Sequence, residues 1–324
     1  MEIVKTKGSV SNYSNGLPSK EKKENKFLKK FKRGKYLFLL VIPTVICMLL
    51  FYYLPMWGIL IAFKQYSPFK GLAGSPWVGL KHFRTFFENP FFFRYFRNTI
   101  LLSFYSLIWG FPAPIIFALI LNDVQNIRFK KLVQTVSYMP HFYSTVVVVG
   151  LFTMFLSPTS GPVNKLIQFF GHKPISFLAD AKYFRTIYVA SEIWQNLGWG
   201  AIIYLAALTN IDPQLYEAAI IDGASKFKRL IYVTLPCLAP TIITMLLLRL
   251  GHIMNVGFER AYLLQKPSTY ETSDIIQTYI YRTGIESNNF SFASAVGLFN
   301  SVINVIFLVG CNKLSQYLTE TSLW

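Results

Sequence analysis

Two long apolar stretches of the sequence each carry a short series of polar side chains. If both stretches are helices, residues three or four positions apart share one face, and polar groups gather there. Polar groups inside apolar spans are costly, so they indicate either a solute pathway or side chains that pair with one another. Both interpretations stay open. The first series is Glu192, Gln195, Asn196 and Trp199, and the second is Arg249, His252 and Asn255.

A third series lies between these two stretches, from about 210 to 236. Asp212 followed by Pro213 is typical of a helix start, because aspartate caps the helix and proline at the first helical position loses no hydrogen bond. A Glu-Ala-Ala triplet then favours helix, and Gly223 can end it in a left-handed conformation. The sequence predicts a compact helix–glycine–helix element. Its marked positions are Glu217, Ala218, Ala219, Asp222, Gly223, Leu235 and Pro236.

Catalytic signatures are missing from the sequence. It contains no phosphate-binding loop of the form Gly-x-x-x-x-Gly-Lys-Ser/Thr, so we expect that this chain does not hydrolyse ATP. The four histidines and three cysteines have no metal-ligand spacing. We therefore expect no catalytic residue, no metal site and no cofactor in this chain.

The composition indicates a membrane protein. Only 15% of the residues are charged and 53% are hydrophobic, whereas soluble chains are about a quarter charged. A helix of about 20 apolar residues crosses the hydrocarbon core of a bilayer. We predict an all-α, polytopic membrane protein with about six transmembrane helices. The apolar runs lie at roughly 36–63, 98–121, 132–156, 183–208, 237–257 and 292–312.

The first 35 residues differ from the rest, with eleven lysines or arginines against three glutamates. The apolar run that follows is too long for a signal peptide, so we expect a retained anchor. The basic tail is predicted to be a cytoplasmic arm on anionic lipid. Nucleic-acid binding is the alternative, but no base-reading element accompanies the tail. The predicted parts are the tail 1–35, a first helix with its outer loop 36–95, a transmembrane domain 96–312 and a tail 313–324.

The distribution of charge predicts an orientation. A basic tail in the cytoplasm places both termini there, because six spans is an even number. The extracytoplasmic segments and the adjoining span edges then hold thirteen basic and six acidic residues. A positive mouth would steer an anionic solute toward the protein. Screened charges that merely flank the spans explain the same excess.

The spacing of the third series resembles the signature of type I ABC importer permeases. Glu-Ala-Ala, then Gly223, then Val233 and Leu235-Pro236 fall at that signature's offsets, with valine where isoleucine is commoner. Other stretches are similar to the oligosaccharide branch, and within it to permeases for complex or acidic sugar oligomers of the alginate-oligosaccharide type. These stretches are 76–80, 138–141, 194–199 and 251–254.

The resemblance implies a function and a set of partners. The loop would be the coupling helix that docks on a cytoplasmic ATPase, and two such ATPase subunits would bind ATP and Mg. A second homologous permease would complete a heterodimer in the bacterial cytoplasmic membrane. An extracytoplasmic solute-binding protein would deliver an oligosaccharide for transport by alternating access. The alternatives are the same importer for a peptide, amino acid or anion, and a non-transporting membrane scaffold or sensor.

Overall fold

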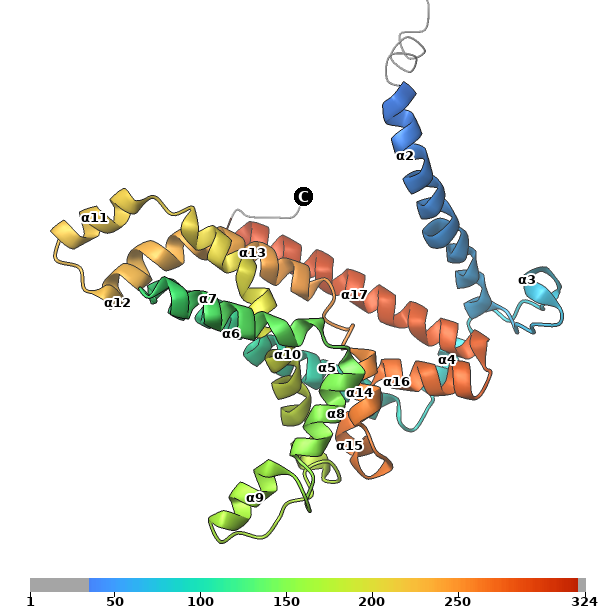
Figure 1. The fold of residues 1–324 in the computed structure, drawn as a ribbon. Helices are drawn as coiled ribbons and strands as arrows, with labels where there is room; N and C mark the ends of the chain where they lie inside the picture. Colours follow the sequence, from blue (N-terminus) through green and yellow to red (C-terminus); the bar gives the residue numbers. More distant parts are fainter. Residues whose placement is uncertain (1–34, 320–324) are drawn as a thin grey trace, which may run out of the picture. The chain divides into compact units, whose positions relative to one another are not determined.

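The computed structural model describes residues 35–319, and the predicted basic tail therefore lies almost wholly outside the described residues. The described chain is almost entirely helical, and a single β-bridge joins Lys64 and Trp77 within it (Figure 1). It divides into two units, which end and begin at residues 57 and 58. The predicted all-α class is confirmed.

The described part of the first unit is one apolar helix. α2 (Lys35–Met48) continues through the π-helical turn η1 (Leu49–Tyr53) into the 3₁₀ segment η2 (Leu54–Phe63), which crosses into the second unit. Together they form a candidate membrane span, Leu39–Phe63, whose most apolar 18-residue window has no buried residue. Large side chains such as Leu40 (75%) and Phe51 (72%) are exposed. A continuous exposed apolar surface of this kind requires lipid or a partner chain.

The second unit consists of helices of very different length. The long ones are α5 (Phe92–Tyr105), α6 (Pro112–Asp123), α7 (Ile127–Tyr138), α8 (Thr145–Phe155), α10 (Ala181–Thr209), α13 (Leu235–Leu250) and α17 (Phe290–Thr319). The short ones are α3 (Gly71–Gly74), α4 (Lys81–Phe87), α9 (Pro162–Phe169), α11 (Pro213–Ile221), α12 (Lys226–Arg229), α14 (Phe258–Leu264), α15 (Tyr270–Ser273) and α16 (Ile276–Tyr281). Further 3₁₀ and π turns are η3 (Ser106–Gly110), η4 (Met139–Phe142), η5 (Leu230–Thr234), η6 (Pro267–Thr269) and η7 (Arg282–Glu286).

Four helices of the described chain are long and apolar enough to cross a membrane, or five if a bent pair counts as one span. The bent pair is α7–η4 with α8, which meet at 105°. The predicted count of six is not confirmed. If the bent pair counts as one span, α10 is the predicted span that is missing from the five. Its 29 residues are about 44 Å long, but its polar residues make it less apolar than the other spans. The four spans are Leu39–Phe63, Phe92–Asp123, Lys226–Leu250 and Phe290–Gly310.

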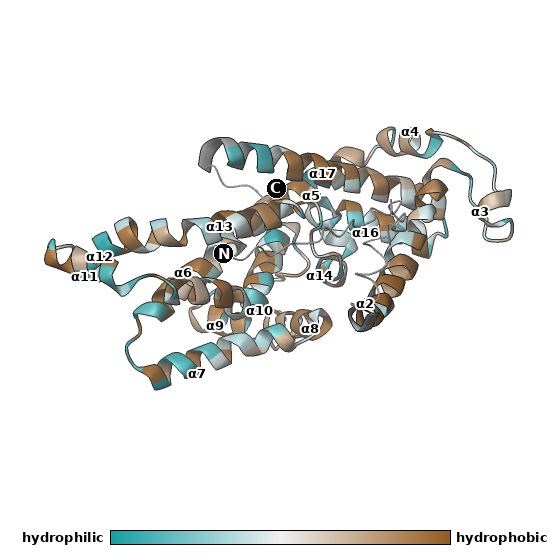
Figure 2. Cartoon of the chain, turned by 90° about the horizontal axis from the view of Figure 1, so that it is seen from above, coloured by the Kyte–Doolittle hydropathy of each residue, from teal (hydrophilic) through white to brown (hydrophobic). Residues whose placement is uncertain are grey.

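α10 is the central helix of the second unit. One core cluster joins it to α6 and α13, with Ala201, Leu205, Ile115 and Leu238 buried in it. Small residues let neighbouring helices approach, since a Cβ atom on Gly198 would lie 2.3 Å from the carbonyl oxygen of Ser137. Large apolar side chains such as Ile116 and Ile120 of α6 and Leu248 of α13 are exposed on these helices, as expected for contact with lipid. Much of α17 is also coloured as hydrophobic in Figure 2.

A buried carboxylate ties α5 to the segment around α15 and α16. Asp274 is fully buried and pairs with Arg282 at 2.9 Å and with Arg94 at 3.2 Å. Asn98 of α5 donates to the backbone carbonyls of Glu271 and Asp274. Two guanidinium groups therefore compensate the buried charge, and the hydrogen bonds fix the fold of this end of the unit.

The tight approach at Gly198 generates a prediction. In Gly198→Ala the new methyl group would collide with backbone atoms of residue 137, and overpacking of this kind costs about 1–3 kcal/mol. Unfolding of the purified protein by denaturant in detergent should show this loss. The matched control is Gly150→Ala in α8, where no atom lies within 4 Å of the added methyl group. Equal stability of the two variants would contradict the packing described here.

Candidate functional site

The helix–glycine–helix element forms as predicted. Asp212 caps α11 by accepting a hydrogen bond from the Gln214 backbone N–H at 2.9 Å. Gly223 ends the helix with φ +73°, and Ala224 N–H donates to the Ala219 carbonyl at 2.9 Å. This pattern is a Schellman motif, in which a left-handed residue satisfies the last carbonyl groups of a helix. We call residues 210–236 the hairpin; it runs from the end of α10 to the first turn of α13.

The hairpin presents an unusual surface. α11 and α12 lie at one extremity of the second unit (Figure 1). Glu217, Ala218, Asp222 and Gly223 are exposed, while Ala219 and Leu235 are half-buried and Pro236 is exposed. Large apolar side chains are exposed on the same element: Leu215 (46%), Ile220 (54%), Ile221 (85%) and Phe227 (69%). An exposed apolar patch of this kind beside charged residues marks an interaction surface.

One side-chain contact closes the hairpin and another joins it to α6. The Tyr216 hydroxyl lies 3.0 Å from the Thr234 hydroxyl, which joins α11 to η5, the turn directly before α13. Lys226 at the start of α12 lies 3.6 Å from Asp123 at the end of α6. The second contact is exposed and long, so it contributes little. The hairpin is therefore joined most directly to α10 and α13.

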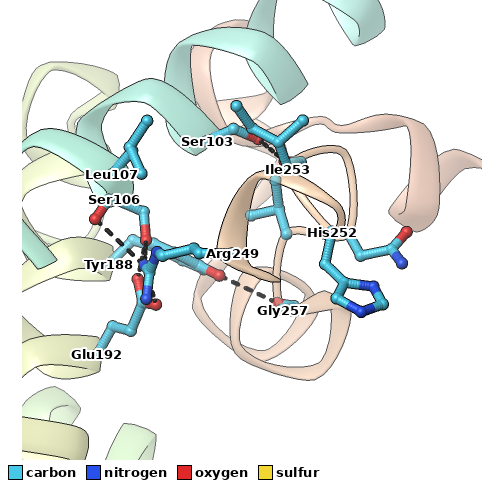
Figure 3. Close-up of a pocket in the computed structure, with 11 residues that line it drawn as sticks. Ser103, Ser106, Leu107, Tyr188, Glu192, Arg249, His252, Ile253 and Gly257 are labelled. Carbon is cyan, nitrogen blue, oxygen red and sulfur yellow. Dashed lines mark hydrogen bonds and ion pairs between the residues drawn. The ribbon is translucent and has the colours of Figure 1, made fainter. Parts of the chain in front are cut away.

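The two predicted intramembrane series meet at one ion pair. Glu192 of α10 and Arg249 of α13 lie 3.0 Å apart, and their side chains are 22% and 36% exposed. Arg249 also donates to the hydroxyl (2.7 Å) and the carbonyl (3.2 Å) of Ser106, whose hydroxyl donates to Glu192. Figure 3 shows these three side chains converging. We call this group the polar node; it connects α10, α13 and η3.

Local backbone features make room for the node. The chain between α5 and α6 becomes π-helical at Ser106–Gly110, and such turns are frequent at functional sites. A Cβ atom on Gly110 would lie 3.3 Å from the Arg249 guanidinium. A larger residue at 110 would therefore crowd the ion pair.

Two cavities share the node. One of about 210 Å³ is lined by Ser103, Ser106, Tyr188, Glu192, Arg249, His252 and Asn255, among others. A second of about 120 Å³ is lined by Gly110, Glu192, Asn196, Trp199 and Arg249, among others. Both cavities offer amide and charged groups, and the larger one offers hydroxyl groups as well; such linings suit a polyhydroxylated solute better than an apolar one.

An aromatic stack lies beside the second cavity. Trp199 is 47% exposed, and its ring stacks on His141 with centroids 4.5 Å apart and planes 4° apart. A His141 ring nitrogen lies 3.1 Å from the Asn196 side-chain oxygen, and Asn196 donates to the Glu192 carbonyl. An exposed aromatic ring next to amide and charged groups is a surface on which a ring-shaped solute can stack.

Gln195 occupies a different environment from its predicted companions. It is buried, its amide donates to the Tyr143 carbonyl at 2.8 Å, and its oxygen accepts from the Arg260 guanidinium. Arg260 is only 6% exposed and donates to Ser191 as well. Gln195 is not among the residues that line either cavity at the node. The structure thus assigns Gln195 to a packed network between α10 and α14.

The expected helical spacing of Arg249, His252 and Asn255 is wrong. α13 ends at Leu250, and the next residues form turns through bonds such as His252 N–H to the Arg249 carbonyl. Asn255 is held by three amides, because its oxygen accepts from Gln277, Asn300 and Asn304. His252 and Asn255 still line the larger cavity, from the segment after the helix.

Sequence reasoning missed Ser106, Arg260 and the role of His141. Ser106 lies in an otherwise apolar run, so its hydroxyl was a usable signal. Arg260 lies between the predicted apolar runs 237–257 and 292–312, in a predicted outer segment, where a basic residue is expected to be solvated and does not indicate a site. His141 was noticed only as part of a family-like stretch.

Comparison with known proteins gives the class of this molecule. Residues 99–316 match the family described as binding-protein-dependent transport system inner membrane component, and the chain belongs to this family. It is a permease, a transporter subunit, with membrane-spanning helices.

Among its relatives is the polygalacturonan/rhamnogalacturonan transport system permease protein YteP of Bacillus subtilis. The two are 43% identical over 94% of this chain and 95% of the relative. A crystal structure of a bacterial ABC transporter involved in import of the acidic polysaccharide alginate has a chain 43% identical, with a TM-score of 0.85 over 91% of this chain and all of that one. A second crystal structure is that of a bacterial alginate ABC transporter in complex with alginate pentasaccharide-bound periplasmic protein. Its matching chain is 42% identical, with a TM-score of 0.86 over 92% of this chain and all of that one. The predicted type I ABC permease fold is confirmed.

The polar node generates a prediction that separates its two interpretations. Glu192→Gln and Arg249→Met should each lower stability, because each leaves one charge without its partner. The double variant should be more stable than the sum of the two losses implies, with a coupling energy of about 0.5–3 kcal/mol. If the node belongs to the solute pathway, oligosaccharide uptake by the folded double variant should be far below that of the wild type.

Denaturant unfolding and uptake by reconstituted vesicles measure the two quantities. Wild-type uptake by the stable double variant would show that the ion pair only joins the helices. Additive losses of stability would show that the pair is not coupled.

Proposed function

We propose that this chain is one of two membrane-spanning subunits of an ATP-driven importer that brings an oligosaccharide into a bacterial cell. The observation that carries the proposal is the hairpin: a rigidly capped helix with an exposed apolar patch, joined directly to the two helices that hold the polar node. The match to sugar-transport permeases over more than nine-tenths of the chain supports the substrate class.

The proposed partners follow from the family, whose members belong to binding-protein-dependent transport systems, and from the sequence, which has no phosphate-binding loop for ATP. Two ATPase subunits would bind ATP and Mg in the cytoplasm, and the hairpin would dock on one of them. A second, homologous permease would cover apolar surface of this chain, and a solute-binding protein would deliver the sugar outside. Both chain termini would lie in the cytoplasm, on the same side as the hairpin.

The geometry suggests how force would travel. Movement of α11 reaches α13 through the chain itself and through the Tyr216–Thr234 contact. From Leu235 to Arg249 is 14 residues of helix, about 21 Å. Since α10 enters the hairpin from its other side, a push on the hairpin would shift α13 against α10 at the node. Opening and closing of the two cavities there would be one part of alternating access.

The polar groups that line the two cavities at the node would recognise sugar hydroxyls. Asn196, His252 and Asn255 offer donors and acceptors, and Trp199 offers an aromatic face. An acidic oligosaccharide is the preferred substrate class in this proposal. The excess of basic residues in the predicted outer segments would favour it, and one of the similar structures belongs to an importer of an acidic polysaccharide.

The hairpin can be tested with two glycines of matched geometry. Gly223 has φ +73° and Gly171, in the loop after α9, has φ +79°, and neither has an atom within 4 Å of an added Cβ. Gly223→Val and Gly171→Val should therefore introduce similar backbone strain. We expect Gly223→Val to abolish sugar-stimulated ATP hydrolysis in the reconstituted complex, and Gly171→Val to leave it unchanged. A second hairpin variant, Glu217→Lys, should abolish it as well. Unchanged hydrolysis and uptake in both hairpin variants would leave the loop a mere connector.

Ionic strength tests the acidic preference. If positive charge steers the substrate, uptake of a uronic oligosaccharide should fall steeply between low and high salt, while uptake of a neutral oligosaccharide should change little. Lys165→Gln with Lys173→Gln, in the segment around α9, should reduce the salt dependence. Equal insensitivity of the two sugars to salt would remove the charge argument.

A further inference from the structure

A third cavity, distinct from those at the polar node, lies at the base of the hairpin. Its volume is about 490 Å³. It is bounded by the last turn of α6, by Tyr216 of α11, and by α12 with the start of η5. Its lining residues include Leu119, Ile120, Asn122, Asp123, Tyr216, Lys226, Phe227, Arg229, Leu230 and Thr234. The proposed sugar pathway does not use this cavity.

The position of this cavity indicates the level of lipid headgroups. The candidate span Phe92–Asp123 ends at one of its lining residues, and the candidate span Lys226–Leu250 begins at another. Two spans thus leave the hydrocarbon region at the same place. Leu119, Ile120 and Leu230 provide an apolar wall on the membrane side of that boundary.

The charges of the cavity suit a phosphate group. Lys226 and Arg229 line it, and the Nε atom of Arg229 is buried without a hydrogen-bond partner among the described residues. The polar residues Asn122, Tyr216 and Thr234 line it as well, although the Tyr216 and Thr234 hydroxyl groups lie 3.0 Å from each other. Asp123 is the opposing charge, but its contact with Lys226 is 3.6 Å long and largely exposed. A phosphate oxygen can replace so weak a partner.

Neighbouring basic residues extend the positive surface. α7 begins four residues after α6 ends, so Arg128, Lys130 and Lys131 emerge on the same side of the spans as Lys228. A basic pocket between transmembrane helices, with apolar walls below it, is the typical binding site of an anionic lipid headgroup.

We propose that this cavity binds the phosphate headgroup of an anionic glycerophospholipid, with the acyl chains along the apolar wall. The lipid would bridge the end of α6 and the base of the hairpin, where the protein's own contact between Lys226 and Asp123 is weak. Occupancy would hold the hairpin against the spans and strengthen coupling to the ATPase. This consequence rests on the proposed function, whereas the binding itself does not.

Lipid binding can be measured directly. The full-length chain, co-expressed with its transport partners, is placed in nanodiscs that contain a photo-crosslinkable phosphatidylglycerol. We expect crosslinks to map to residues 119–123 and 226–234. Lys226→Gln with Arg229→Gln should weaken binding about thirty-fold, the equivalent of about 1 kcal/mol for each basic residue near the surface. Lys228→Gln, a neighbour that does not line the cavity, is the matched control; it lowers only the charge of the surrounding surface and should weaken binding no more than about five-fold.

Two further arms make the result decisive. Ile120→Trp fills the cavity without removing a charge, and it should also block binding; this covers the case in which the charge variants fold poorly. In separate experiments, excess phosphatidylcholine or inorganic phosphate is added to compete with the phosphatidylglycerol probe for the cavity. Equal crosslinking in all variants, or crosslinks that map elsewhere, would overturn the proposal. Displacement by inorganic phosphate alone would overturn it too, in favour of a soluble anion.

The link to coupling is tested last. In wild-type complex, replacing phosphatidylcholine by phosphatidylglycerol should raise sugar-stimulated ATP hydrolysis several-fold, and the double variant should lose this rise. Lipid binding without any effect on hydrolysis would leave the site standing and remove its regulatory role. Absence of sugar-stimulated hydrolysis in every lipid would count against the proposed function and not against the site.

Discussion

Hydrocarbon cannot hydrate a charge, and this constraint explains the arrangement around Glu192 and Arg249. An isolated glutamate or arginine within a membrane-spanning segment is costly, so each must find a partner inside the protein. The two residues lie on helices separated by the whole hairpin, and they can pair only if α10 and α13 pack side by side at one height. The π-turn at 106–110 and the absence of a side chain at Gly110 then follow as requirements of the same contact. One ion pair thus fixes the register of three elements.

The hairpin depends on a different kind of interaction. Its shape comes from local backbone chemistry: a capping aspartate at one end of α11 and a left-handed glycine at the other. Such an element can keep its form without support from the rest of the unit, since no residue of α11 is buried. A rigid, weakly anchored element that connects two firmly packed helices is suited to transmit displacement. The hairpin and the node therefore differ in what holds them. The shape of the hairpin comes from local caps, whereas the node is held by an ion pair between helices that are distant in the sequence.

This division also explains what the sequence could and could not predict. The start and end of α11 were predictable because Asp212, Pro213 and Gly223 act on their immediate neighbours. The end of α13 was not, because the turn at 251–254 is held by distant partners such as Asn304, which accepts from the Met254 backbone N–H. Five of the six predicted apolar runs overlap a candidate span or the bent pair among the described residues, but α10 is too polar to be classed as a span by hydropathy alone. Pairing of Glu192 with Arg249 was one of two open interpretations, and Ser106 and Arg260 were missed because their importance comes from tertiary contacts.

The polar networks of the second unit differ in how free they are to change. Asp274 is fully buried between two arginines, and Arg260 is 6% exposed with hydrogen bonds to Ser191 and Gln195. Breaking either network would strand a buried charge, so both are expected to stay intact throughout any transport cycle. The Glu192–Arg249 pair is partly exposed and lines two cavities, so water or a solute hydroxyl can replace either partner at lower cost. Any rearrangement should therefore take place at the node, around the frameworks that the buried Asp274 and Arg260 hold in place.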